Sequence, residues 1–283
     1  MICNSGNTTA IKNDFALASS HNTFTKQLKL FCVRNVILLL MLPVSLNAQT
    51  VGDYRTVKNG DWLDASSWEQ LQALPNNWIL AISPPGPTTP SIAILSGDTI
   101  TVSSASSGNN ITVEDGGNLI IDAPIADAFQ FSGDNFNYGD VTWINGTMSF
   151  TSNAVTITNH GSFIINDIAG NANILSPGTI TNASDGTFSF KTTFGIIINP
   201  LFINQGAFLG TGSISFNNNF QNSGVISPGG RNNISTLRFE SSSTTLAAGS
   251  VIYLDIVDNK EKVLAVICYF LIQTDHSHLQ IPV

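Results

Sequence analysis

A short phrase recurs along the chain and limits the folds that this sequence can adopt. Each copy holds an Asn, then a Gly, then small polar residues alternating with large apolar ones; the copies are Ile144–Phe150, Thr158–Ile165, Thr181–Phe190, Ile203–Leu209 and Gln221–Ile226. The glycines, from Gly146 to Gly224, follow one another at intervals of 15, 25, 20 and 18 residues. An irregular period near 20 excludes helical repeats of the tetratricopeptide kind, which need about 34 residues.

The phrase itself predicts a stack of short parallel strands. Gly accepts a positive φ and so turns the chain without steric cost, while alternation places every second side chain on one face of a strand. One such rung cannot bury its apolar face, but stacked rungs bury a continuous row, and Asn side chains at the turns can bond from rung to rung. We therefore expect a right-handed parallel β-helix of about eight rungs spaced by about 4.8 Å. An antiparallel β-sandwich is the alternative, since short strands between turn residues are typical of it too.

The composition agrees with an all-β protein that does not bind nucleic acid. Charged residues make up 11% of the 283, whereas the chain holds 30 Asn, 30 Ser, 26 Thr and 23 Gly. Helix-rich enzymes are therefore disfavoured, and the 42% of hydrophobic residues argues against disorder. The net charge of −8 and the scarcity of Lys and Arg exclude a nucleic-acid partner.

Residues 1–48 are expected to be an upstream extension followed by a signal peptide. Lys26, Lys29 and Arg34 precede the apolar run Val36–Val44, and a small residue, Ala48, offers a cleavage point. The run is too short to span a bilayer, so we expect no integral membrane span in the mature chain. Cleavage would remove Cys3 and Cys32 and leave Cys268, which excludes a disulfide within one mature chain.

Three further segments follow in the mature chain. Residues 49–96 hold Trp62, Trp68 and Trp78 and a proline-rich stretch, and they are expected to cap the first rung, with a sugar-binding platform of Trp as the alternative. Residues 97–257 hold the β-helix repeats, and residues 258–283 form an atypical tail.

The segments Gly60–Trp68, Ser96–Val102 and Val113–Ile121 resemble the opening of secreted repeat proteins of the Bacteroidetes. Later segments resemble the passenger β-helix repeats of autotransporter-type and adhesin-like proteins; they are Leu209–Ile214, Asn222–Gly229, Thr236–Phe239 and Leu246–Ile256. The resemblance covers about residues 55 to 256 and implies a secreted protein or one on the outer surface of a Gram-negative bacterium. The tail departs from the pattern: Val263–Ile272 is expected to be a last strand, a capping element or the product of a truncated or frameshifted reading frame.

The repeats offer little catalytic chemistry. Residues 97–250 contain ten acids and three bases, and the best candidate pair is Asp134 and Asp140, in a segment expected to be a solvated loop. A glycosidase would need two carboxylates facing each other, and a lyase would need a base beside acids. No metal site or cofactor is predicted: His160 is expected at a solvent-facing turn, and His276 and His278 lie in the tail.

The phenylalanines of the repeats are expected to line the interior of the coil rather than to present an aromatic stripe to glycans; they are Phe150, Phe163, Phe188, Phe190, Phe194, Phe202, Phe208, Phe216 and Phe220. The sequence thus predicts an exported structural or adhesin-like β-solenoid without catalytic activity, with an extracellular glycan or a surface protein as partner. The alternative is a carbohydrate-active or carbohydrate-binding β-helix with Asp134 and Asp140 near its site.

Overall fold

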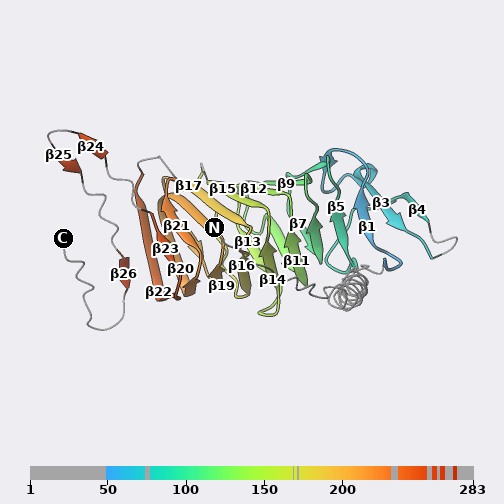
Figure 1. Cartoon of the computed structure of the whole chain (residues 1–283). Coiled ribbons are helices and arrows are strands. Elements are labelled where there is room, and N and C mark those ends of the chain that lie inside the picture. The colour runs from blue at the N-terminus through green and yellow to red at the C-terminus, as the bar shows by residue number, and fades with distance from the viewer. Residues whose placement is uncertain are drawn as a thin grey trace, which may run out of the picture. The chain divides into compact units, whose positions relative to one another are not determined.

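The computed structural model describes residues 49–73, 77–167, 169–170, 172–230 and 235–253, and the backbone of three short strands beyond them (Figure 1). The predicted signal peptide, residues 1–48, lies outside the described residues, as do Cys3, Cys32, Cys268, His276 and His278.

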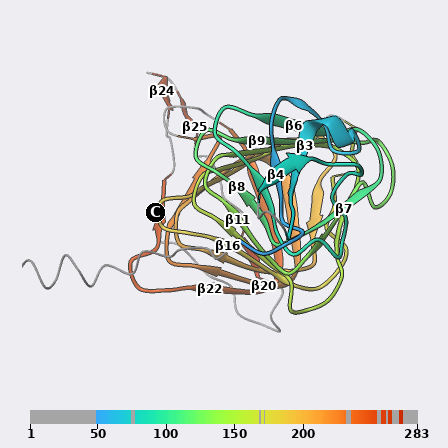
Figure 2. The same ribbon diagram turned by 90° about the vertical axis from the view of Figure 1, so that its right-hand side faces the viewer.

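The chain winds through three faces in turn and returns to the first, so that each strand pairs in parallel with the strand one coil before and one coil after it (Figures 1 and 2). The first face holds β1 (Tyr54–Thr56), β5 (Ile92–Ile94), β8 (Ile111–Val113), β11 (Asp134–Asn137), β14 (Thr156–Asn159), β16 (Thr179–Asn182), β19 (Leu201–Asn204) and the last residues of β20 (Ala207–Asn222) and β22 (Leu237–Leu246).

The second and third faces are built in the same way. The second face holds β2 (Gly60–Asp61), β6 (Thr99–Val102), β9 (Asn118–Asp122), β12 (Asp140–Asn145), β15 (Ser162–Asp167), β17 (Thr187–Thr192), the first residues of β20, β21 (Val225–Pro228) and β23 (Val251–Ile252). The third face holds β7 (Ser106–Asn109), β10 (Phe129–Ser132), β13 (Met148–Phe150), a bridge at Ile174, β18 (Ile196–Ile198), the middle of β20, the start of β22 and β26 (Phe270–Ile272).

This arrangement confirms the predicted β-helix and excludes the β-sandwich. Equivalent residues of the first face, Val113, Asn137, Asn159, Asn182, Asn204 and Asn222, lie 24, 22, 23, 22 and 18 residues apart, which matches the period near 20. Seven complete coils begin at β5, β8, β11, β14, β16, β19 and the end of β20, and the end of β22 with β23 begins an eighth.

The antiparallel pairs of the described residues lie outside the coils. Near the N-terminal end β3 (Trp68–Leu71) pairs with β1 and with β4 (Trp78–Leu80), after a short 3-10 turn, η1 (Ala65–Ser67). Further on, β24 (Val257–Asn259) pairs with β25 (Lys262–Leu264). Within the predicted tail, β26 extends the third face by pairing with β22.

The interior is a column of apolar side chains, mostly isoleucine and phenylalanine. On the second face Phe163, Phe188 and Phe208 stack from coil to coil, with ring centroids 5.2 and 5.7 Å apart. Eight of the nine phenylalanines expected inside are buried. Phe194 is the exception, because it lies in the connection between β17 and β18 and is 66% exposed.

A column of buried amides runs along the edge between the first and second faces. The column contains Asn137, Asn159, Asn182, Asn204 and Asn222, and the side-chain nitrogen of each of the first four donates to Oδ1 of the Asn one coil later, at 2.6 to 2.8 Å. All five are at most 2% exposed. The predicted stacking of Asn at the turns is therefore confirmed, and we call this column the Asn ladder.

The register corrects two expectations about the repeated phrase. Asn145 and Gly146 lie on and after β12, at the next edge of the coil, and Asn137-Tyr138-Gly139 is the copy in register with the ladder. The ladder glycines also have a different role from the one expected. A Cβ on Gly161 would lie 2.1 Å from the carbonyl oxygen of Gly139, so close approach of the preceding coil, not a positive φ, requires glycine there.

Trp62 and Trp68 fill the interior near the N-terminal end. Both side chains are fully buried, and the Trp68 indole nitrogen donates to the Trp62 carbonyl oxygen at 3.0 Å. Trp62 also meets Phe129 of the third face edge-to-face at 4.7 Å. These two residues therefore form core rather than a sugar-binding platform, while Trp78 lies half-buried beneath the guanidinium of Arg55, 4.4 Å from its ring centre.

Candidate functional site

The structure places the two candidate acids on different faces of one coil. Asp134 is the first residue of β11 and Asp140 is the first residue of β12, so the segment expected to be a loop consists of strand and a tight corner. Both residues are exposed. The Asp134 carboxylate accepts a hydrogen bond from the Thr156 hydroxyl at 2.8 Å. Asp134 therefore bonds along its own face, and the two carboxylates do not face each other across a groove.

The basic residues of the repeats lie elsewhere. Lys191 is near the end of β17 on the second face, and Arg238 on the third face forms an ion pair of 2.6 Å with Glu240. Arg231 lies outside the described residues. In the described part of the chain, no group of three or more His, Cys, Asp or Glu side chains could hold a metal ion.

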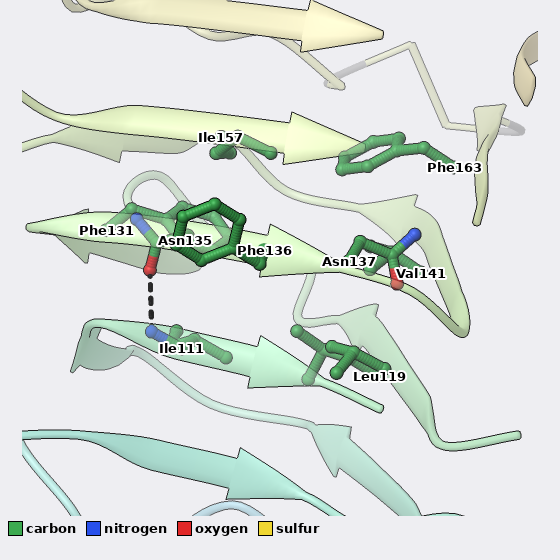
Figure 3. A pocket seen from close by; sticks show the side chains of 10 residues that line it. Ile111, Leu119, Phe131, Asn135, Phe136, Asn137, Val141, Ile157 and Phe163 are labelled. Atoms are coloured by element: carbon green, nitrogen blue, oxygen red, sulfur yellow. Dashed lines mark hydrogen bonds between the residues drawn. The ribbon is translucent and has the colours of Figure 1, made fainter. Parts of the chain in front are cut away.

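A small cavity lies inside the coils that contain β8, β11 and β14 (Figure 3). Its volume is about 20 Å³, and its walls are mainly apolar side chains such as Ile111, Phe131 and Ile157. Asn135 closes one side by accepting a hydrogen bond from the Ile111 backbone nitrogen at 3.0 Å. Because a single water needs about 10–15 Å³ measured in this way, the cavity has no room for a sugar ring.

Three nearly parallel rings lie partly exposed on the outer surface of the coils. We call Phe136, Tyr138 and His160 the aromatic ledge. The Tyr138 and His160 rings stack with centroids 5.0 Å apart and planes 11° apart, and Phe136 and Tyr138 are 6.3 Å and 12° apart. Phe136 is 37% exposed and Tyr138 is 45% exposed.

The strand pattern and the Asn ladder together build the ledge. Along β11 the side chains alternate, so buried Asn135 and Asn137 leave Phe136 pointing outward, and Tyr138, directly after the strand, is also exposed. The pairing of Asn137 with Asn159 then sets Tyr138 and His160 in equivalent places on consecutive coils. Each residue follows a ladder Asn and precedes a glycine, which brings the two rings into stacking distance.

The ledge is supported on its C-terminal side by an ion pair. Nδ1 of His160 lies 2.9 Å from Oδ1 of Asp185, which belongs to the corresponding corner of the next coil. The hydrogen bond from the His160 side chain, helped by a backbone hydrogen bond and by the charge of His160, holds the pKa of the Asp185 carboxyl below its usual 3.8. Asp185 therefore stays ionised beneath the ring stack to a lower pH than a free carboxyl would.

The corner of the preceding coil next to Tyr138 is acidic. The corner that contains Glu114 and Asp115 lies against Tyr138, whose backbone nitrogen donates to the Val113 carbonyl oxygen at 2.8 Å. Glu114 and Asp115 are exposed, and Asp140 follows directly after the corner.

Sequence reasoning located one member of the ledge and missed the other two. His160 lies at the turn between β14 and β15 as expected, although stacking and the ion pair leave its side chain only 31% exposed. Phe136 and Tyr138 were assigned to a loop. The signal that could have found them is the phrase Asn137-Tyr138-Gly139, a copy of the repeat at the usual spacing before Asn159-His160-Gly161.

Comparison of the chain with protein-family models, curated proteins and solved structures finds no match in any of the three. Among the residues that the structure describes, none belongs to a helix with the length and apolar character needed to cross a bilayer.

Proposed function

We propose that this chain is an exported structural or adhesin-like β-solenoid without catalytic activity, acting at the cell surface or outside a Gram-negative bacterium. Its partner is an extracellular glycan or a surface protein. The proposal combines the signal-peptide pattern of residues 26–48 and the resemblance to secreted repeat proteins with a β-solenoid fold compatible with such a role.

The observation that carries the proposal is how the coils are held together and what they turn outward. Each coil is tied to the next by parallel backbone pairing and by the Asn ladder, which suits a rigid scaffold. The outward positions of adjacent strands carry small hydroxyl side chains, for example Thr156 and Thr158 beside Thr179 and Thr181. Such faces supply rows of hydroxyl groups to a partner.

The alternative, a polysaccharide lyase or glycosidase, is tested by incubating the purified full chain with neutral and acidic polysaccharides. The measurement is the release of reducing ends and of unsaturated uronate products. We expect no release by the wild-type chain or by an Asp134→Ala, Asp140→Ala double variant. Release by the wild type that the double variant abolishes would replace the structural role with a carbohydrate-active one at these two acids.

A further inference from the structure

We propose that the aromatic ledge of Phe136, Tyr138 and His160 is a binding site for a neutral glycan. This inference deepens the proposed adhesin-like role, on which it rests, by naming the site and the chemical class of the partner.

Phe136 and Tyr138 supply the aromatic surface of the ledge. An exposed aromatic ring on a rigid frame offers an apolar surface that packs against the apolar face of a pyranose at little cost in conformational entropy. Phe136 and Tyr138 belong to one coil, their planes are 12° apart, and both side chains are exposed. The backbone beneath them is fixed by pairing of β11 with both β8 and β14.

His160 holds the Tyr138 ring in its orientation. His160 covers one side of this ring at 5.0 Å and is itself held by Asp185. A ring held in this way loses little freedom on binding. His160 is therefore a positioning residue for Tyr138.

Polar side chains lie on the coils beside the rings. Thr112 and Thr158 pair with Phe136 on the preceding and following coils, and neither hydroxyl is engaged by another described residue. Exposed carboxylates belong to the adjoining corner, at Glu114 and Asp115, and to Asp140, two residues after Tyr138. Hydroxyl groups both donate and accept, and carboxylates accept, which together match the hydroxyls of a sugar.

The charge of the surroundings selects among possible ligands. The ledge is bordered by acids and the chain carries a net charge of −8, which disfavours acidic glycans by like-charge repulsion. A basic peptide would match the carboxylates and could place a cation over Tyr138. The flanking threonine hydroxyls favour the glycan, since sugar hydroxyls use both their donor and their acceptor capacity, whereas an ammonium or guanidinium group uses the acceptor capacity alone.

The test is binding of the purified full chain to immobilised neutral oligosaccharides, namely oligomers of glucose, mannose, galactose and N-acetylglucosamine. Wild type is compared with Tyr138→Ala, Tyr138→Phe and Phe136→Ala. Phe194→Ala is the matched control, because Phe194 is also an exposed phenylalanine but lies outside the ledge. Circular dichroism of each variant shows that the fold is retained.

We expect selective binding of at least one oligosaccharide class, weakened at least about tenfold by Tyr138→Ala. Tyr138→Phe should keep most of the affinity and Phe194→Ala should keep all of it. Binding that Tyr138→Ala leaves unchanged, no binding to any neutral oligosaccharide, or capture of an oligolysine probe alone would each overturn the proposal. The assay uses purified protein and does not depend on export, so its failure is distinguishable from failure of the proposed function.

Discussion

The side-chain nitrogen of Asn182 donates a hydrogen bond of 2.8 Å to Oδ1 of Asn204, one coil further along the stack. Both side chains are fully buried, and Asn182 in turn accepts from Asn159 at 2.7 Å. The Asn182 amide thus accepts a hydrogen bond from the preceding coil and donates one to the following coil, at a buried edge of the solenoid. This relationship ties the repeat in the sequence to the stability of the fold.

Replacement of Asn182 by Ala should therefore destabilise the protein well beyond the loss of one side chain. The change removes one of three acceptors of the Asn159 amide, which keeps the Gly161 and Thr187 carbonyl oxygens, and it takes the ladder donor from the buried Asn204 oxygen, at a cost of about 1–3 kcal/mol for that oxygen. Urea unfolding followed by circular dichroism measures the effect. Gln205→Ala, at an exposed neighbouring position, is the control and should change stability by about 0.5 kcal/mol or less. Equal effects of the two changes would show that the Asn ladder is not stabilising.

Gly206→Ala tests the close approach of consecutive coils. An added Cβ would lie 2.2 Å from the carbonyl oxygens of Ala183 and Gly186, so the backbone must shift. We expect a loss of about 1–3 kcal/mol, as for other overpacked positions. Gly86→Ala is the matched control, because its Cβ would meet nothing within 4 Å. Equal thermal midpoints of the Gly206 and Gly86 variants would show that the close approach of the coils does not require glycine at position 206.

Phe208→Ala tests the aromatic interior. Phe208 is fully buried and lies among Phe188, Phe202 and Phe220, with centroids 5.5 to 5.7 Å away. Removal of the ring should cost about 3–5 kcal/mol through lost burial and the cavity left behind. Phe194→Ala on the surface should cost about 0.5 kcal/mol or less. Similar unfolding midpoints for the two variants would contradict the assignment of Phe208 to the core.

The ion pair beneath the aromatic ledge predicts a pH dependence. Because the pKa of Asp185 is lower in the folded chain than its usual 3.8, the pair stabilises the protein above that value and this contribution is lost as the pH falls through the folded pKa. Carbon NMR of the Asp185 carboxyl should show a pKa below 3.8 in the wild type and a value closer to 3.8 in His160→Gln. An identical titration of Asp185 in both proteins would show that His160 does not hold it.

Much of the fold could be predicted from the sequence because its signals are local. Alternation such as Thr187–Phe190 fixes which side chains face inward, and the recurring Asn and Gly fix where each coil turns. The error at Asn145 and Gly146 has a physical cause: an Asn-Gly pair is turn chemistry at any edge of a coil, and only the strand register distinguishes one edge from another.

The aromatic ledge could not be predicted in the same way. Stacking of Tyr138 on His160 depends on the register that pairs Asn137 with Asn159, 22 residues later, and coil length varies too much along the chain for the sequence alone to fix that register. Asp134 and Asp140 attracted attention as a close pair in the sequence, but an edge of the coil lies between them. Proximity in the sequence is therefore a poor guide to the outer surface of a solenoid, where neighbours come from adjacent coils.

Export is tested most directly on cells that express the full chain with its own leader. Protein is recovered from outside these cells, and the mass of its N-terminal peptide is measured. We expect extracellular or surface-exposed protein that begins at Gln49, after cleavage behind Ala48. Protein retained in the cytoplasm with residues 1–48 intact would contradict export and, with it, the adhesin-like role.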